Sequence, residues 1–583
     1  MDNKWDVLQN NMEIENELVE KMNLNRLVAK ILINRGIDSV ESVEKFLYST
    51  LEDLPSPMLM TDMDVAVDRI IRAIKDREQI VIFGDYDVDG MSSTSLLVNF
   101  FSSLNHPVSF YIPHRINEGY GLNSTAIKQF AEEGCTLLIT VDCGVTSVSE
   151  VALASEHGID VIITDHHQVS EDLPPAYALL NPSRKECGYP FKHLAGVGIA
   201  YKLVSALKDE LVASGVIGIR DIPNLKRSLD LVSLGTLADM VPLIGENHLL
   251  VRFGLEEMAK SQKVGLRALM KLGNFGSRPI ADTDIGFYIA PRLNAIGRLQ
   301  NARMGVELLT TTDKKRAKEI AKKLDEENSK RQEIQNNMLQ EVLSMVNKEV
   351  DLETDKAIVL ASEGWHPGVI GIVASRVVEK FNLPTILLNI ENGICRGSAR
   401  SIPSFHIYNG LTNCKAMLMH FGGHKYAAGL TLDLSQLEKF RIDFIKIAGE
   451  GLPVEPQESV ISIDARASIE SLTPSLIEEI MELGPFGPQY PYPILLSEEV
   501  EFIGEPFFVG KRDEHVRFEV GDIDNGVDGI GFGVAEKYRE RYKKDSKFDI
   551  VYSPALVVRN EMSKVVQIRL QDLCESNLKG VYQ

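Results

Sequence analysis

Several features that would place a chain in a specialised class are missing from this sequence of 583 residues. No apolar run reaches the roughly 18 residues that a membrane-spanning helix needs, and the N-terminus lacks the basic-then-apolar layout of a signal peptide. The six cysteines are dispersed without a C-x-x-C pair, so neither a zinc ribbon nor a disulfide framework is indicated. A G-x-x-x-x-G-K-[ST] loop is also missing, which disfavours an NTP-driven motor. We expect a cytoplasmic protein without membrane segments.

Positive charge is scarce as well. The chain has 62 Lys and Arg against 83 Asp and Glu, a formal net charge of −21. This balance argues against capture of nucleic acid by a broad basic surface. It is compatible with a confined basic groove, because metal-binding carboxylates raise the acidic count and are neutralised locally. Composition therefore does not decide the substrate.

The length indicates several domains, which we assign by pattern. Residues 1–60 are expected to form an N-terminal helical cap. Short β-branched runs alternate with helical patterns over 61–300, which predicts an α/β domain with a parallel sheet. We expect a connecting helix with a solvated charged face at 301–350 and a second α/β domain at 351–450. After a linker, the short alternating strands of 451–583 favour an OB-like β-barrel, a fold often used for single strands.

Four acidic or histidine-bearing motifs stand out in the first half of the chain. They span residues 84–90, 141–144, 164–167 and 238–240. The first three follow apolar runs that read as strands. Parallel strands end at one shared edge of a sheet, where ligands collect. We therefore expect these distant motifs to surround one metal centre.

The first motif, with Asp85, Asp87 and Asp89, also admits simpler interpretations. Its D-x-D-x-D-G pattern opens an EF-hand loop, but that loop needs a Glu at position 96, where Leu96 stands, and a preceding helix. A turn with solvated acids stays open for this motif taken alone. The helix expected from Met91 onward would direct its free N–H groups at the same place, which suits a phosphate.

The other motifs supply imidazoles and further acids. Adjacent histidines in extended backbone point in different directions, so His166 and His167 suit one metal contact and one substrate contact. Asp239 lies in an apolar segment, where a cap, a salt bridge or a cation must compensate its charge. Carboxylates with one or two imidazoles favour a Mn²⁺ or Mg²⁺ site, and two such ions about 4 Å apart would support phosphoester hydrolysis.

Candidate phosphate partners are cationic side chains that stand beside the later motifs and glycine-rich passages. They are Arg115, Arg298, Arg400 and Lys425. Each taken singly also fits an ordinary surface or salt-bridge residue.

Taken together, the motifs resemble the DHH phosphoesterase superfamily, named for the triplet seen here as Asp165-His166-His167. Within it the chain is most similar to the RecJ family of single-strand-specific 5′→3′ DNA exonucleases. The supporting strings lie at 83–90, 181–182, 194–198, 237–243 and 291–298, and strings at 364–376 and 422–424 resemble the associated DHHA1 domain. The resemblance covers about residues 20–575.

The resemblance also implies roles for single residues. The metal-ligand positions correspond to Asp87, Asp89, Asp142, His166 and Asp239, with Asp142 bridging two ions. Asp85 would support the site without binding the ions, and Asp165 would orient the histidines. His167 would contact the scissile phosphate. Substrate phosphate contacts are expected from Arg115, Arg298, Ser398, Arg400 and His424.

By the same resemblance we expect a monomeric exonuclease in DNA repair and recombination that releases 5′-mononucleotides from single-stranded DNA. A single-strand-binding protein and a RecQ-type helicase are the expected partners, and the chain is expected to lack a C-terminal extension that some relatives carry. Two alternatives stay open. One is a superfamily enzyme for short RNA or dinucleotides, and the other is a binding module with a degenerate site.

Overall fold

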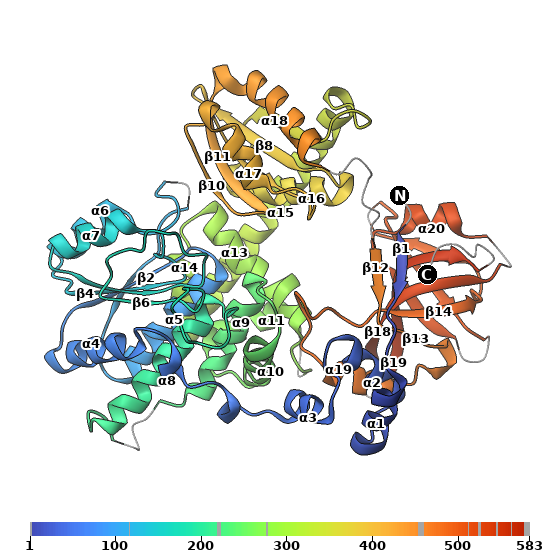
Figure 1. Ribbon diagram of the computed structural model, residues 1–583, viewed down its shortest axis with the longest axis horizontal. Helices are drawn as coiled ribbons and strands as arrows, with labels where there is room; N and C mark the ends of the chain where they lie inside the picture. Colours follow the sequence, from blue (N-terminus) through green and yellow to red (C-terminus); the bar gives the residue numbers. More distant parts are fainter. Residues whose placement is uncertain are drawn as a thin grey trace. The chain divides into compact units, whose positions relative to one another are not determined.

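The computed structural model describes residues 3–115, 117–218, 223–275, 278–452, 460–510, 512–522, 526–543, 546–560 and 563–576 (Figure 1). It divides into two compact units. Unit 1 comprises Met1–Pro55, Met240–Phe253 and Gln457–Gln583, and unit 2 comprises Ser56–Asp239 and Gly254–Pro456. In the described ranges no helix combines the length and hydropathy needed to cross a membrane.

Unit 2 begins with a five-stranded sheet in which every neighbouring pair is parallel, in the order β3-β2-β4-β5-β6. The strands are β2 (Ile80–Gly84), β3 (Ser109–Tyr111), β4 (Leu137–Val141), β5 (Asp160–Thr164) and β6 (Ala178–Leu180). β2 and β4 are buried along their whole length, as apolar strands covered on both faces should be. The predicted parallel sheet is confirmed.

Helices cover both faces of this sheet. They are α4 (Met63–Asp76), α5 (Val88–Ser103), α6 (Ser124–Glu132), α7 (Val148–Glu156) and α8 (Gly196–Ala213). Figure 1 shows α6 and α7 on one face and α4 and α8 on the other. The expected start of α5 at Met91 is wrong, because the helix begins at Val88. Asp87 is its N-cap and accepts a hydrogen bond from Gly90 N at 3.0 Å, the role in which Asp stabilises a helix start.

A helical region follows in the chain. It comprises α9 (Leu229–Asp239), α10 (Gly245–Ala259), α11 (Val264–Leu272), α12 (Asp282–Asp284), the π-helix η4 (Ile285–Ile289), α13 (Ala290–Leu299), α14 (Arg303–Thr310) and α15 (Lys314–Glu349). Helix α15 extends over 36 residues, with Asp313 as its N-cap. It confirms the predicted long connecting helix.

The second α/β part of unit 2 has a sheet in the order β10-β11-β9-β8-β7. Its elements are β7 (Ile358–Glu363), α16 (Pro367–Phe381), β8 (Thr385–Glu391), β9 (Ile394–Arg400), α17 (Ile407–Asn413), β10 (His420–Gly423), β11 (Ala427–Asp433) and α18 (Leu437–Gly451). Two apolar clusters fill its faces. One joins α15 and α16 to the sheet, and the other joins α17 and α18 to it.

Unit 1 combines both ends of the chain. Its elements are β1 (Lys4–Val7), α1 (Met12–Met22), α2 (Arg26–Asn34), α3 (Val40–Tyr48), β12 (Val460–Ile463), β13 (Ala465–Arg466), α19 (Pro474–Glu482), β14 (Leu495–Val500), β15 (Phe507–Val509), β16 (His515–Val520), β17 (Val527–Gly531), α20 (Ala535–Arg541), β18 (Phe548–Asn560) and β19 (Ser563–Glu575). Seven strands form one sheet in the order β13-β14-β18-β19-β17-β16-β15.

The first residues belong to the same core as this C-terminal sheet. β1 pairs with β12 in parallel, and buried residues of α1 to α3 join those of α19, β16 and β18 in one cluster. Residues 1–60, expected to be helical, thus include a strand. Their description as a separate cap stays a prediction. The expected linker at 451–456 lies outside the described residues from 453 onward.

Candidate metal centre and phosphate-binding residues

The parallel sheet brings three acids into a row. Asp85, Asp142 and Asp165 directly follow β2, β4 and β5, and the last residues of these neighbouring strands are paired in register. All three carboxylates are at least 96% buried. Strand order alone therefore gathers residues that are 80 positions apart in the sequence, as expected for a parallel sheet.

Two helices add the remaining acids. Asp87 caps α5 and Asp89 lies in its first turn, while Asp239 is the last residue of α9. The Asp89 carboxylate accepts hydrogen bonds from Gly196 N at 2.7 Å and Val197 N at 2.9 Å. These amides open helix α8, so the positive end of its dipole faces the carboxylate and stabilises it.

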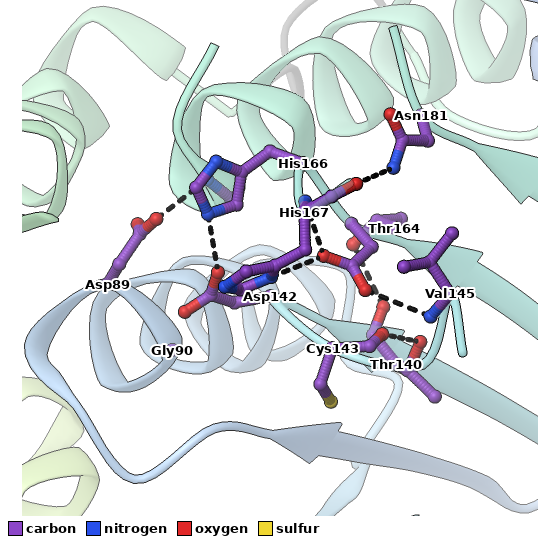
Figure 2. A network of polar contacts seen from close by, with 12 residues as sticks. Asp89, Gly90, Thr140, Asp142, Cys143, Val145, Thr164, His166, His167 and Asn181 are labelled. Atoms are coloured by element: carbon purple, nitrogen blue, oxygen red, sulfur yellow. Dashed lines mark hydrogen bonds and ion pairs between the residues drawn. The ribbon is translucent and has the colours of Figure 1, made fainter. Parts of the chain in front are cut away.

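Ligand atoms gather in three groups, each with its atoms within 4.8 Å of one another. They are Asp85, Asp87 and Asp142; Asp89, His166 and Asp239; and Asp142, His166 and His167. His166 Nε2 lies 3.2 Å from Asp142 Oδ1 and 3.4 Å from Asp239 Oδ2, and Figure 2 shows its ring directed at Asp142. The first two groups share no residue, so the arrangement offers two separate ion positions.

The backbone around Asp142 is adapted to this crowding. Asp142 itself has a positive φ of 61°, a conformation that Asp adopts more readily than most residues. Neighbouring glycines leave room for the carboxylates. A Cβ at Gly196 would lie 2.7 Å from Asp142 Oδ1, and a Cβ at Gly235 would lie 2.6 Å from Asp89 Oδ1.

The crowded carboxylates disfavour their own ionised forms. Burial, followed by repulsion from Asp89, Asp87 and Asp239, raises the pKa of Asp142 well above its usual range. Burial and the charge of Asp87 likewise raise the pKa of Asp89 to about 7. The pKa values of Asp85 and Asp239 are raised for the same reasons. Such mutual repulsion requires a compensating positive charge.

Unused ligand atoms fit divalent cations. Asp85 Oδ1, Asp142 Oδ1 and His166 Nε2 are buried and make no hydrogen bond within the described residues. Burial lowers the pKa of His166 to about 4, so its ring is neutral at pH 7 and its nitrogen can bind a metal. Carboxylate oxygens with one imidazole suit Mn²⁺ or Mg²⁺. Asp85, expected to stay outside the ligand set, lies within one of the candidate groups.

His167 is held in the opposite charge state. Burial lowers its pKa, but the hydrogen bond to Asp165 outweighs burial and the pKa rises to about 9. Asp165 Oδ1 lies 2.7 Å from His167 Nδ1 and also accepts a hydrogen bond from His167 N. Asp165 Oδ2 accepts one from Val145 N at 2.9 Å. The carboxylate thus fixes the orientation of a charged imidazole.

Two further partners of His167 were given no individual role from the sequence, although Asn181 belongs to one of the supporting strings. Tyr120 OH lies 3.1 Å from His167 Nδ1 and donates to the Asp142 carbonyl at 3.4 Å. Asn181 Nδ2 donates to the His167 carbonyl at 2.9 Å, as Figure 2 shows. A lone Tyr in a loop carries no sequence signal. Asn181 follows β6 directly, so its place at the strand edge could have indicated it.

Cationic residues from both α/β parts form a second group. Arg298, at the end of α13, donates to the Gly368 carbonyl at 3.1 Å. Its pKa falls to about 9 because of burial and then of repulsion by other arginines, Arg115, Arg331 and Arg400. Burial, followed by the charge of Arg115, also lowers the pKa of Arg400. Arg298 therefore lies within electrostatic range of the other three guanidinium groups.

The remaining candidates for phosphate binding have contacts of their own. Ser398 Oγ accepts a hydrogen bond from Arg400 at 2.7 Å. Burial lowers the pKa of His424, with Arg400 and His167 contributing, so His424 faces both groups. The Arg115 guanidinium lies 4.8 Å from the Tyr86 ring centre, and the Lys425 ammonium lies 5.1 Å from that of Tyr426.

Arg331 was not identified because the charges of α15 were assigned to a solvated face. Its guanidinium donates to Asn328 and Gln335 at 2.6 and 2.7 Å, and burial lowers its pKa. One of many charged residues on a long helix carries no individual signal. Only packing shows that this one faces Arg298.

A parallel sheet whose strand ends carry carboxylates and an imidazole defines a phosphoesterase of the DHH type. The chain matches the models of the DHH family N-terminal domain at residues 79–236, of the DHHA1 domain at 354–450 and of the RecJ OB domain at 463–572. The chain belongs to the RecJ family.

Individual relatives agree with this assignment. The single-stranded-DNA-specific exonuclease RecJ of Bacillus subtilis is 38% identical over 98% of this chain and 71% of its own length. The protein of the same name from Dickeya dadantii is 35% identical over 88% of this chain and 90% of its own length. The crystal structure of RecJ with Mn²⁺ from Thermus thermophilus superposes with a TM-score of 0.80 at 26% identity, over 98% of this chain and 79% of that one.

Proposed function

We propose that the protein hydrolyses single-stranded DNA from the 5′ end to 5′-mononucleotides, in DNA repair and recombination, with Mn²⁺ or Mg²⁺. The observation that carries this proposal is the pair of disjoint ligand groups, Asp85, Asp87 and Asp142 beside Asp89, His166 and Asp239. The relatives named single-stranded-DNA-specific exonuclease and the structure solved with Mn²⁺ support it.

We assign metal binding to Asp87, Asp89, Asp142, His166 and Asp239, with Asp142 between the two positions. Its contact with His166, which belongs to the other group, supports this bridging role. These residues would hold two ions, whose charge would acidify a water and stabilise the departing oxygen of a phosphodiester. Asp85 is close enough to the first group to serve there as well.

The chain's own residues orient the strand. Asp165 holds His167 charged through Nδ1, which leaves the Nε2–H group of the ring to donate a hydrogen bond to a phosphate oxygen. In the reaction the bond between phosphorus and the 3′ oxygen of the leaving nucleotide breaks, and the shortened strand keeps a 5′ phosphate. Arg298, Arg400 and Ser398 would bind strand phosphates, and the mutual repulsion of these arginines favours an anionic ligand.

A strand path between the two α/β parts is supported by a cavity of about 490 Å³. Arg115 lines it from the first part, and Gly368, Asn389 and Arg396 line it from the second. A passage built this way guides a flexible single strand along positive side chains. We propose that it selects single strands because a duplex is too wide for it.

The decisive assay uses a 5′-labelled single strand with and without Mn²⁺. Loss of label that requires the metal and stops with a chelator is expected. No loss of label, or loss that a chelator does not affect, would contradict the proposal. Faster turnover of a dinucleotide than of a long strand would favour the short-oligonucleotide alternative.

Further proposals concern the cellular setting. We propose that the protein acts as a monomer in the cytoplasm, where chromosomal DNA is accessible. A single-strand-binding protein and a RecQ-type helicase are the proposed partners, since both deliver single strands. Pull-down with either purified protein, at physiological salt, tests the pairing directly.

A further inference from the structure

A second cavity in unit 2 shares no residue with the metal centre or the arginine group. It encloses about 580 Å³ and is lined by the ends and connections of several helices. The residues that matter for its chemistry are Asn99, Arg227, Asp230, Lys260, Lys263 and Thr312. This volume lies within the range of about 300 to 1,000 Å³ typical of small-molecule sites.

The floor of the cavity is a preformed polar network. Asp230 is 99% buried. Its carboxylate accepts hydrogen bonds from Lys263 Nζ at 2.7 and 3.0 Å and from Ser261 Oγ at 2.7 Å. Lys263 Nζ also donates to the Arg227 carbonyl at 2.8 Å. A network with every member bonded holds the cavity in one shape and neutralises its own charges.

The wall carries positive charge that this network leaves uncompensated. Glu257 lies 3.8 Å from Lys226, and Asp230 is paired with Lys263. Glu257 also lines the cavity, but in the described part of the chain the exposed side chains of Arg227 and Lys260 have neither an ion pair nor a hydrogen bond. Two unpaired cations in a chain of net charge −21 make a local site for an anion.

We propose that this cavity binds a phosphomonoester, namely a nucleoside monophosphate. Arg227 and Lys260 would hold the phosphate, whose charge of about −2 at neutral pH matches theirs. The Thr312 hydroxyl and the Asn99 amide offer hydrogen bonds to a sugar or base. Inorganic phosphate shares the charge but would leave most of the volume unfilled.

The cavity is connected to the metal centre by two helices. Helix α9 carries Asp230 in its first turn, at the cavity, and ends with Asp239, about 14 Å away along the helix axis. Helix α5 carries Asp89 in its first turn and Asn99 in its fourth. A ligand that shifts these helix ends would therefore alter the metal centre, and if the proposed function holds, that ligand is the reaction product.

Binding is tested by calorimetry with dAMP in EDTA, in an Arg400→Gln background that weakens phosphate binding at the main site. Adding Arg227→Gln and Lys260→Gln should weaken the binding of dAMP by about tenfold or more. Lys318→Gln, an exposed position on α15 outside the cavity, should leave it unchanged. Equal affinity in both variants overturns the proposal, and so does tighter binding of inorganic phosphate than of dAMP.

Regulation is tested separately with the otherwise unaltered chain. Added dAMP should inhibit initial hydrolysis less in the Arg227→Gln, Lys260→Gln double variant than in the wild type, at equal uninhibited rates. The same inhibition in both proteins overturns the regulatory role. A protein that binds dAMP in calorimetry but lacks nuclease activity would contradict the proposed function and leave the binding site standing.

Discussion

Two groups of like charges are buried in unit 2, and they behave as mirror images. In the carboxylate group, burial and repulsion raise the pKa of Asp142 and Asp89. In the arginine group, the same two effects lower the pKa of Arg298 and Arg400. Burying like charges together destabilises a fold unless a partner of opposite charge enters. Both groups therefore favour a ligand of opposite charge, and we propose cations for the carboxylates and phosphates for the arginines.

The largest expected effect comes from a substitution in the carboxylate group that should lower activity and raise stability. Asp142→Asn should reduce hydrolysis on the order of a thousandfold or more, because it removes the carboxylate that we propose to lie between the two ion positions. The same substitution should raise the metal-free melting temperature, because it removes a carboxyl group whose ionisation is opposed by burial and by the neighbouring acids. Rate assays and thermal melts measure the two changes.

Asp68→Asn is the matched control, since Asp68 is exposed on α4. Neither rate nor melting temperature should change in it. A metal-free Asp142→Asn protein that melts below the wild type would contradict the repulsion argument.

The arginines should show a smaller effect with a different signature. Arg400→Gln should lower kcat/KM by roughly a hundredfold, the usual cost of losing a charge-assisted phosphate contact. The loss should shrink with rising salt, which screens phosphate contacts. Arg267→Gln, an exposed change on α11, should leave the rate intact. Equal losses in the two variants would mean that Arg400 acts only through bulk charge.

Metal binding should stabilise only the protein with an intact carboxylate group. At a Mn²⁺ concentration of 100 to 1,000 times the dissociation constant, the expected gain is about 3 to 4 kcal/mol. Thermal unfolding with and without Mn²⁺ measures this gain. Asp142→Asn should abolish most of it, whereas Arg400→Gln should keep it. If Mn²⁺ stabilised neither variant, the carboxylates and the arginines could not be separate binding groups.

Tyr120→Phe should reduce the rate less than the changes above, because Tyr120 acts on His167 beside the carboxylate group. The hydroxyl touches His167 and the Asp142 carbonyl, so its removal should lower kcat about tenfold through a misplaced imidazole. Affinity for Mn²⁺ should be unaltered, because the hydroxyl bonds the backbone carbonyl of Asp142 and His167 Nδ1 and, among the described residues, none of the carboxylates. A large loss of metal affinity would show that Tyr120 supports the ions instead.

The smallest expected effect concerns His248 of unit 1, a buried ionisable residue outside both charged groups. Burial lowers the pKa of His248 to about 4, and its Nε2 lies 3.1 Å from the Leu483 carbonyl. The folded pKa is below the unfolded one, so stability is complete above about pH 6.5 and falls as pH decreases towards 4. Between pH 7 and 5.5 the loss should be about 1 kcal/mol.

Urea unfolding at the two pH values measures this loss. His248→Gln should make the unfolding free energy of unit 1 less dependent on pH over that window. An unchanged pH dependence in the variant would assign the acid sensitivity to other groups.

The fold could be predicted where the pattern is local. β2, β4 and β5 are short apolar runs, and each is followed by an acid, so both the strands and their shared edge followed from periodicity. The start of α5 was placed three residues too late, because Asp87 was considered only as a metal ligand and not also as an N-cap. The pairing of β1 with β12 joins positions more than 450 residues apart, beyond the reach of any sequence window.

For the metal centre, the amino-acid sequence determined which side chains would be present and that they would stand at strand and helix ends. Only the tertiary structure decided that Asp85 joins a ligand group, that Tyr120 meets His167 and that Arg331 faces Arg298. The reason is physical. Periodicity and capping are set by neighbours along the chain, whereas burial, repulsion and close approach depend on which elements pack together.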